Sequence, residues 1–298
     1  MDPEIATSYK AAEDVARRRA RNFYYSFLAL PPEKRRALCA VYAFMRYCDD
    51  ISDGPGAAQD KSARLQQWRA QLEGAVSGRF DGSPILPAFH DAMRRFSIPP
   101  QYFHWIIDGE EMDLTVTQYP TFDDLYRYCF RVASAVGLVC LQIFGYADDS
   151  ARKHAEHCGI AFQLTNILRD IREDAVLGRI YIPAEDLDRF HYPAEDLRRG
   201  VQDARFQRLM SYQANRARQY YSQGRNLLPL VDGASRPALW AMIEIYEGLL
   251  KKIIRRRYDV FTAPVRLSGA GKAAIAARAL AMRLWSSPRR SPEKTPAP

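Results

Sequence analysis

The 298-residue chain lacks several features that mark whole classes of protein. It has no apolar run of about 18 residues, the length that a membrane-spanning helix needs. The longest apolar stretch, residues 132–147, is shorter and includes Ser134 and Gln142. The first ten residues, MDPEIATSYK, contain acids and no apolar segment typical of a signal peptide. We therefore expect a cytoplasmic protein without a membrane span.

Cysteine and histidine are scarce, with five residues of each. No two cysteines have the Cys-x-x-Cys spacing of redox or zinc sites, so we expect reduced thiols in the core. His154 and His157 stand three residues apart, but no further soft ligand lies near them in the sequence. We expect a surface pair there rather than a metal site. The sequence also shows no Ser-His or Cys-His set of the kind that activates a nucleophile.

Alternating strand patterns of convincing length are missing as well, and no strand–helix–strand rhythm is visible. Long segments of helical periodicity are instead separated by joints that contain proline or glycine. Pro32 suits the first position of a helix, and Thr121 with Asp124 predicts the start of another. A further helix is expected from Asp148 to about Asp174. The fold class is therefore all-α.

No composition break or internal repeat divides the chain. Hydrophobic residues make up 47% of it, which is enough for one large core, so residues 1–287 are predicted to form a single domain. Residues 288–298, PRRSPEKTPAP, are rich in proline and are predicted to form a disordered tail.

Positive charge is concentrated near the C-terminus. From Lys251 onward, 12 Lys and Arg residues face two acids, a net of +10, so the first 250 residues sum to −2 within the total of +8. Such a segment suits peripheral contact with an anionic membrane or with a diphosphate, although it can equally serve as a solvated helix face. No nucleic-acid-binding module is recognisable, so nucleic acid is not an expected partner.

Carboxylates gather where a helix is expected to end, in AVYAFMRYCDDISDG at residues 40–54. Acids at a helix C-terminus are disfavoured by about 0.3–1 kcal/mol because the helix dipole is negative there. Asp49 and Asp53 are four residues apart and share one helix face, which Arg46 and Tyr42 continue. Taken alone, this motif is a weak signal and is most simply explained as a solvated helix end.

A second stripe of oxygen ligands lies in QLTNILRDIREDAVLGRIYIP, residues 163–183. Asn166, Asp170 and Asp174 are spaced four residues apart, again toward the end of an apolar helix. Two such stripes call for a hard cation, and Mg²⁺ prefers one or two carboxylates with substrate phosphate oxygens. Two facing stripes and a diphosphate of roughly −3 charge would require about three Mg²⁺ ions. Arginines near the second stripe, such as Arg179, suit phosphate oxygens.

Small residues and aromatic residues supply a further pattern. The segment RVASAVGLVCLQIFG, residues 131–145, contains Ala133 and Gly137, which fit either tight helix packing or the wall of a tunnel for a hydrocarbon. Phe23 and Phe27 are four residues apart and share a helix face. Aromatic stripes are usually part of a core, so this pair decides nothing by itself.

With these motifs, the chain resembles the squalene/phytoene synthase family, the head-to-head isoprenoid synthases. The resemblance covers roughly residues 20–270 and rests on YSFLALPPEKRRALCAVYAFMRYCDDISD, GEEMDLTVTQYPTFDDLYRYCFRVASAVG, FQLTNILRDIREDAVLGRIYIPAEDL and IYEGLLKKIIRRRYDVF. It is strongest to the bacterial members, which include presqualene diphosphate, dehydrosqualene and phytoene synthases. The resemblance implies an all-α prenyl-synthase bundle with one central cavity.

The resemblance also implies roles by position. It assigns metal binding to Asp49, Asp53, Asp113, Asn166, Asp170 and Asp174. It assigns catalysis to Tyr42, Arg46, Tyr128 and Tyr246. It assigns substrate binding to Phe23, Phe27, Arg46, Val132, Gln163, Asn166, Arg169, Arg179 and Tyr181.

The implied reaction is an Mg²⁺-dependent head-to-head condensation of two allylic diphosphates. In the family, the positions that match Phe23 and Phe27 lie near the closed end of the prenyl tunnel. Two rings one helical turn apart leave little room for a C20 tail, so we expect farnesyl diphosphate, presqualene diphosphate and then a C30 product, squalene or dehydrosqualene. NADPH enters only if squalene is made. The alternative is a phytoene synthase that joins two geranylgeranyl diphosphates.

Two departures from the family bear on how the second diphosphate is held. The segment ARNFYY lacks the serines that many relatives have before the first phenylalanine, and Gln118 replaces a common arginine. More distant alternatives are a head-to-tail synthase or terpene cyclase, disfavoured by Arg179 and Tyr181 after the second motif, and a non-catalytic membrane scaffold. Intact ligand positions in both motifs disfavour the scaffold.

Overall fold

The computed structural model describes residues 2–20 and 23–286, and the predicted tail at 288–298 lies outside them. The elements along the chain are α1 (Pro3–Arg19), α2 (Phe23–Phe27), α3 (Pro32–Ser52), α4 (Ala58–Val76), α5 (Leu86–Arg95), α6 (Pro100–Thr115), α7 (Phe122–Cys129), the π turn η1 (Phe130–Ser134), α8 (Ala135–Phe144), α9 (Ser150–Val176), α10 (Ala184–Arg189), α11 (Ala194–Arg198), α12 (Ala204–Gly224), the 3₁₀ turn η2 (Arg225–Leu227), α13 (Arg236–Arg255) and α14 (Gly269–Ser286). The described residues form no strand longer than an isolated bridge. The all-α prediction is confirmed.

Several predicted helix ends are found where the sequence placed them. Pro32 is the first residue of α3. Thr121 caps α7, with its side chain accepting from the Asp124 backbone N–H while the Asp124 side chain accepts from the Thr121 N–H. The helix expected from Asp148 is α9, which begins at Ser150.

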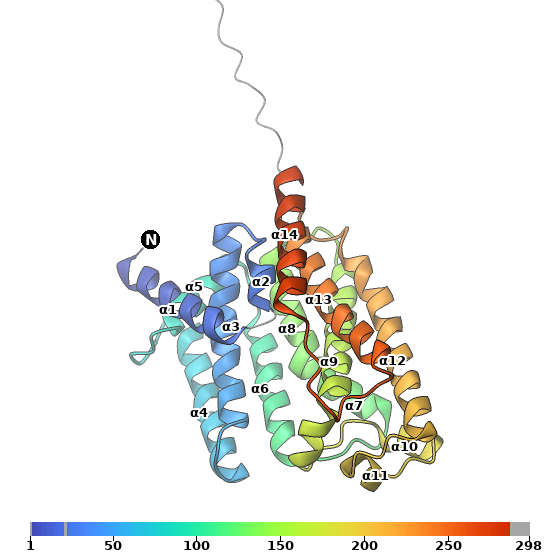
Figure 1. Ribbon diagram of the computed structural model, residues 1–298. Helices are drawn as coiled ribbons and strands as arrows, with labels where there is room; N and C mark the ends of the chain where they lie inside the picture. The colour runs from blue at the N-terminus through green and yellow to red at the C-terminus, as the bar shows by residue number, and fades with distance from the viewer. Residues whose placement is uncertain (1, 21–22, 287–298) are drawn as a thin grey trace, which may run out of the picture.

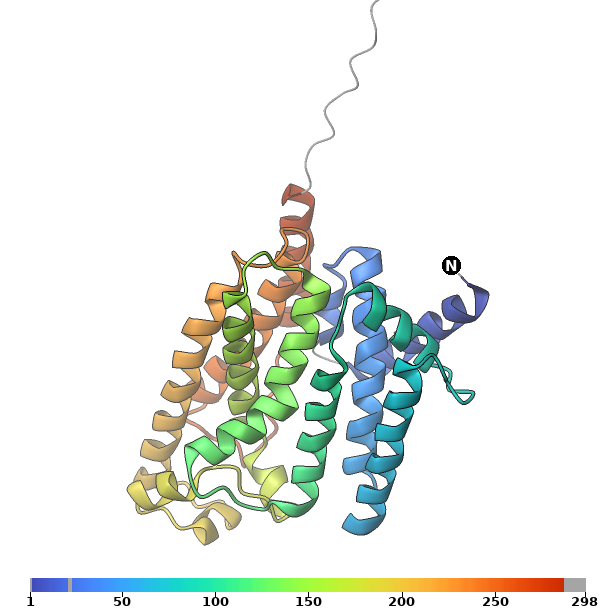
Figure 2. The same cartoon turned by 180° about the vertical axis from the view of Figure 1, so that it is seen from behind.

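The long helices stand side by side and form the walls of one bundle (Figures 1 and 2). Seen from behind in Figure 2, α4, α3, α6, α8, α9 and α12 follow one another across the molecule. α2 lies near one end of the bundle and contacts α13 and α14, whereas α10 and α11 lie at the other end (Figure 1). Because α3 and α9 run the length of the bundle, their C-terminal motifs reach the same end as α10 and α11.

The buried side chains of these helices form one continuous apolar core. All five cysteines are free thiols, and four of them are buried, as predicted. Burial raises the pKa of the Cys39, Cys140 and Cys158 thiols to about 12, so these groups are neutral core residues.

The helical stretch Phe122–Phe144 is long and apolar enough to cross a membrane when judged by length and composition alone. Its 23 residues include a π turn and reach further back than the apolar run at 132–147 considered above. Half of its apolar window is buried inside the protein, as in many core helices, so the finding is weak evidence for a span.

Candidate active site

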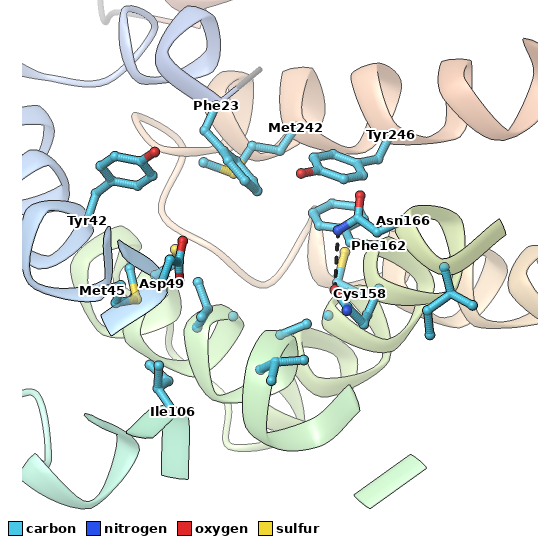
Figure 3. Close-up of a pocket in the computed structure, with 18 of the residues that line it drawn as sticks. Phe23, Tyr42, Met45, Asp49, Ile106, Cys158, Phe162, Asn166, Met242 and Tyr246 are labelled. Carbon is cyan, nitrogen blue, oxygen red and sulfur yellow. Dashed lines mark hydrogen bonds between the residues drawn. The ribbon is translucent and has the colours of Figure 1, made fainter. Parts of the chain in front are cut away.

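A cavity of about 520 Å³ lies between helices of the bundle (Figure 3). Its wall takes residues from α2, α3, α6, α7, η1, α8, α9, η2 and α13 and from the segment that follows α9. It includes every site residue that the sequence predicted: Phe23, Phe27, Tyr42, Arg46, Asp49, Asp53, Asp113, Tyr128, Val132, Gln163, Asn166, Arg169, Asp170, Asp174, Arg179, Tyr181 and Tyr246. The structure thus brings these residues together, while their individual roles stay predictions.

The first carboxylate stripe is carried by the last turn of α3. Asp53 caps this helix, and its backbone N–H donates to the Asp49 carbonyl at 2.8 Å. Burial, opposed by the Arg46 charge and reinforced by the Asp53 and Asp50 charges, raises the pKa of Asp49 to about 7. A carboxylate in this position favours binding of a cation, because the positive charge would offset both the cost of burying the ionised group and its repulsion by Asp50 and Asp53.

Asp50, which lies between the predicted ligands Asp49 and Asp53, binds arginine side chains instead. Its carboxylate accepts from Arg19 Nη2 at 3.0 Å and from Arg46 Nε at 2.9 Å. Burial disfavours the Asp50 charge, but these hydrogen bonds outweigh it and lower the pKa of the carboxyl. Asp50 therefore holds the Arg46 guanidinium, which lines the cavity and also lies 3.4 Å from Asp49 Oδ2.

The second stripe follows one face of α9. Arg169 Nε donates to Asp170 Oδ1 at 2.7 Å, and its Nη2 pairs with the other oxygen of the same carboxylate. Burial, together with the Asp170 charge, raises the pKa of Asp174 to about 7. Asn166 donates from Nδ2 to Gln163 Oε1 at 3.2 Å, while its buried Oδ1 has no hydrogen-bond partner among the described residues.

A tight turn after α9 returns the chain to the cavity. Gly178 has a φ of +78°, a conformation that favours glycine, and the next N–H, that of Arg179, donates to the Asp174 carbonyl at 2.8 Å. Ile180 then donates to the Thr117 carbonyl at 2.8 Å. This backbone bond fixes Arg179 and Tyr181 against the segment that follows α6.

The turn places Tyr181 beside the acid predicted from the GEEMD segment. Its hydroxyl donates to Asp113 Oδ1 at 2.7 Å, and the Tyr128 hydroxyl donates to Oδ2 at 2.9 Å. The rings of Tyr128 and Tyr181 stack with centroids 5.1 Å apart, and Tyr119 lies against both. Burial nevertheless raises the pKa of Asp113, against the effect of these hydrogen bonds and of the Arg179 charge.

Aromatic side chains from α2, α3, α9 and α13 also line the cavity, among them Phe23, Tyr42, Phe162 and Tyr246 (Figure 3). Phe23 lies 5.2 Å from Tyr246, centroid to centroid, and Tyr246 stacks on Phe162 at 4.4 Å. Phe27 is 3% exposed and meets Tyr42 edge to face at 6.3 Å. Rings of this kind offer negative π faces to a carbocation without reacting with it.

Comparison of the sequence with known proteins identifies the family of the chain. The family model for squalene/phytoene synthase matches residues 16–270. The chain belongs to the squalene/phytoene synthase family. It is 40% identical over 292 residues to a phytoene synthase of Mycobacterium tuberculosis, covering 97% of this chain and 96% of the relative. It is 37% identical over 269 residues to the 15-cis-phytoene synthase of Synechococcus elongatus, covering 86% and 87%.

Solved structures of squalene and dehydrosqualene synthases have the same fold as this chain. A dehydrosqualene synthase in complex with a ligand superimposes with a TM-score of 0.86 and 28% identity over 93% of this chain and 97% of that one. The squalene synthase HpnC of Alicyclobacillus acidocaldarius gives 0.82 and 28% identity over 88% and 98%. The chain has the all-α isoprenoid synthase fold and is an enzyme of the prenyltransferase type, one that joins prenyl diphosphates head to head.

Members of this family use Mg²⁺ with diphosphate substrates, and the cavity suits that chemistry. Among the described residues, no three His, Cys, Asp or Glu side chains stand close enough to form a ligand set by themselves. Asp49 lies across the cavity from Asn166, so each stripe offers only part of a coordination shell (Figure 3). The unpartnered Oδ1 of Asn166 and the raised pKa values of Asp49 and Asp174 fit cations that arrive with a diphosphate.

Several residues of the cavity were missed by the sequence analysis, and Glu110 stands out among them. This side chain is only 9% exposed, and burial, reinforced by the Asp49 charge, raises its pKa well above the usual range. A signal for it existed, because Glu110 precedes Asp113 by three residues and so shares its helix face. Phe162, Met45 and Met242 also line the cavity, but apolar helix positions of this kind read as ordinary core residues.

Proposed function

We propose that this enzyme condenses two farnesyl diphosphates to presqualene diphosphate and converts this to a C30 product. The observation that carries the proposal is Phe27, which is almost fully buried and lines the cavity from α2, near the end of the bundle opposite the carboxylate motifs (Figure 1). Phe23, one helical turn earlier, lines the same cavity. Both rings project from α2, which contacts α13 and α14.

Tail length is the physical basis of the choice between substrates. A geranylgeranyl tail has five more carbons than a farnesyl tail, and burying them would gain about 0.8 kcal/mol per CH₂ where space exists. Overpacking against two fixed rings costs about 1–3 kcal/mol instead. The rings of Phe27 and Tyr42 support each other, so neither can turn aside without losing that contact.

The polar end would hold the diphosphates. We assign Mg²⁺, about three ions by charge balance, to Asp49, Asp53, Asp113, Asn166, Asp170 and Asp174. When bound, Mg²⁺ would neutralise the diphosphate and help it to leave from the allylic carbon. Arg46, Arg169 and Arg179 would orient the phosphate oxygens with their guanidinium groups.

Aromatic residues would stabilise the allylic cation after the diphosphate has left. Tyr42 and Tyr246 line the cavity and would stabilise the cation through their rings, and burial raises the pKa of both hydroxyls to about 12, so they stay neutral. Tyr128 would act through its hydrogen bond to Asp113. The largely apolar wall, which includes Val132, excludes water that would otherwise trap the cation. NADPH would be required as hydride donor only if the product is squalene.

A phytoene synthase is the second candidate, because curated relatives at 40% and 37% identity carry that name. The test uses radiolabelled farnesyl and geranylgeranyl diphosphates with Mg²⁺, with and without NADPH, and identifies the products. The proposal expects preference for the C15 substrate and a C30 product. Preference for the C20 substrate with formation of a C40 product would establish the second candidate instead.

We further propose a cytoplasmic enzyme that makes peripheral contact with anionic membrane through its basic C-terminal portion. The described part of that portion includes α14, where Leu280 and Leu284 are exposed, 38% and 79%. Each basic residue near an anionic surface contributes up to about 1 kcal/mol, and salt screens the attraction. Co-sedimentation with phosphatidylserine vesicles should therefore be strong in low salt and lost in high salt. Weak sedimentation that does not respond to salt would contradict the proposal.

A further inference from the structure

Glu110 is a buried carboxyl group without a cationic partner. It lies on α6, is 9% exposed and lines the cavity beside the end of α3. Ser52 donates from its hydroxyl to Glu110 Oε2, and no lysine or arginine of the described residues forms an ion pair with this carboxylate. Its strongest electrostatic interaction with another charged group is with Asp49, a predicted ligand of the first stripe.

A second buried carboxylate of the chain shows what a structural role normally requires. Asp186 is 2% exposed, and it accepts from Gln213 Nε2 at 2.8 Å and from Arg216 Nη1 at 2.5 Å. A buried carboxylate that accepts only from a serine hydroxyl and has no cationic partner is costly, and an apolar residue of similar size would serve better if Glu110 only filled the core. Glu110 instead lines the same cavity as Asp49 and Asp53, the predicted ligands of the first stripe.

We propose that Glu110 is a further carboxylate of the metal–diphosphate site, held toward the first stripe by Ser52, where it increases the affinity for divalent cations. This inference rests on the proposed placement of Mg²⁺ between the two stripes. It adds α6 to the elements that bind the cations, either by direct ligation or through a metal-bound water. Residues in such supporting positions typically change metal affinity by about 10–100-fold.

The test is a titration of the full chain with Mn²⁺ in the presence of inorganic diphosphate, followed by electron paramagnetic resonance. Glu110→Gln is expected to weaken Mn²⁺ binding about tenfold. The matched control is Glu111→Gln, because Glu111 is the neighbouring acid but bonds Arg69 and Gln66 outside the cavity. This control should bind as the wild type does. Ser52→Ala, which keeps the carboxylate but removes its hydrogen bond, should weaken binding by a smaller factor.

Asp53→Asn completes the design, since it removes a ligand of the first stripe itself. If Asp53→Asn weakens Mn²⁺ binding while Glu110→Gln binds as tightly as the wild type or tighter, Glu110 has no part in the metal site. If Asp53→Asn also leaves binding unchanged, the placement of the cations is wrong, and the role of Glu110 falls with it. Should Glu110→Gln fail to fold, as judged by circular dichroism, unchanged binding by Ser52→Ala would overturn the proposal.

Discussion

The two ends of the cavity are built in opposite ways. At one end, the carboxylates of α3 and α9 are held in short motifs with a four-residue spacing, and arginines stand beside them. At the other end, single apolar side chains come from α2, α3, α8, α9 and α13, far apart in the sequence. The polar end would determine the reaction class, while the apolar end would determine which tail fits. One end can therefore change without the other.

Loss of a carboxylate at the polar end should have the largest effect. Asp53→Asn and Asp170→Asn are each expected to lower turnover by more than about a hundredfold, because each removes a proposed ligand while the fold stays intact. Without metal, the thermal stability of Asp53→Asn should hold or rise, since like charges four residues apart repel, whereas Asp170→Asn also loses the ion pair with Arg169 and should be less stable. Steady-state assays measure turnover, and thermal melts measure stability. EDTA should abolish the activity of the wild type.

Asp188→Asn serves as the control for these variants, because Asp188 is exposed on α10 and lies outside the cavity. It should retain wild-type turnover. Full activity of either Asp53→Asn or Asp170→Asn would remove the basis for the two metal stripes.

A change at the apolar end should alter the product rather than stop the reaction. Phe27→Ala is expected to open the cavity, to admit geranylgeranyl diphosphate and to yield some C40 product. Loss of the buried ring should cost roughly 3 kcal/mol of the free energy of unfolding. Product analysis by chromatography and urea unfolding measure the two effects.

Tyr24→Ala is the matched control, because Tyr24 lies on the same short helix and does not line the cavity. It should keep the wild-type product. C40 product from Tyr24→Ala alone, or none from Phe27→Ala, would mean that Phe27 does not set the tail length.

The metal-free enzyme should lose stability as pH rises from about 4 to 7. The pKa values of Asp49 and Asp174 rise from 3.8 to about 7 on folding, so the native state binds more protons than the unfolded state in this range. Their contribution to the free energy of unfolding is therefore largest below pH 4 and is lost by pH 7. Solvent weakens the effect at Asp49, whose side chain is 39% exposed.

Thermal melts in EDTA between pH 5 and 8 test this expectation. The double variant of Asp49→Asn and Asp174→Asn should show a flatter pH profile than the wild type. Mg²⁺ with inorganic diphosphate should stabilise the wild type most at the upper end of the range. Identical profiles for wild type and double variant would show that these two groups do not cause the pH dependence.

The smallest effect is expected at the stacked tyrosines that donate hydrogen bonds to Asp113. Tyr181→Phe removes one of two hydroxyl donors to Asp113 and should cost about 1–2 kcal/mol of stability, with activity reduced less than about tenfold. Tyr119→Phe is the control, because its buried hydroxyl has no partner among the described residues and its loss should be neutral or stabilising. Equal losses of stability in the two variants, measured in urea, would show that the bond to Asp113 is not the cause.

The helices and the polar end were predictable from sequence because local rules govern them. Pro32 and Thr121 mark helix starts, and the spacing of Asp49 with Asp53 fixes a shared face. The meeting of the two stripes in one cavity did not follow from spacing alone. It was expected from the family resemblance and is seen in the structure (Figure 3).

Other features depend on packing between distant segments and left little trace in the sequence. The role of Asp50 follows only in part from the sequence, because Arg46 stands four residues before it on the same helix but its other partner, Arg19, comes from a different helix. Glu110 lies in an ordinary helical segment, and only the fold shows that it has no cation beside it. The π turn Phe130–Ser134, which interrupts the helix from Thr121, has no local sequence rule that would predict it.

Helix α9 spans the whole proposed substrate site. Ala155, Asn166 and Asp174 all line the cavity, so one rigid element would contact the apolar tail, the middle and the diphosphate of a bound substrate. At about 1.5 Å per residue, the first and last of these lie roughly 28 Å apart along the helix axis. One inserted residue would turn everything beyond it by about 100° and move a ligand off the face. The length of the accepted prenyl tail can therefore change through side-chain substitutions along α9, whereas an insertion or deletion in this helix would displace the proposed metal ligands and abolish activity.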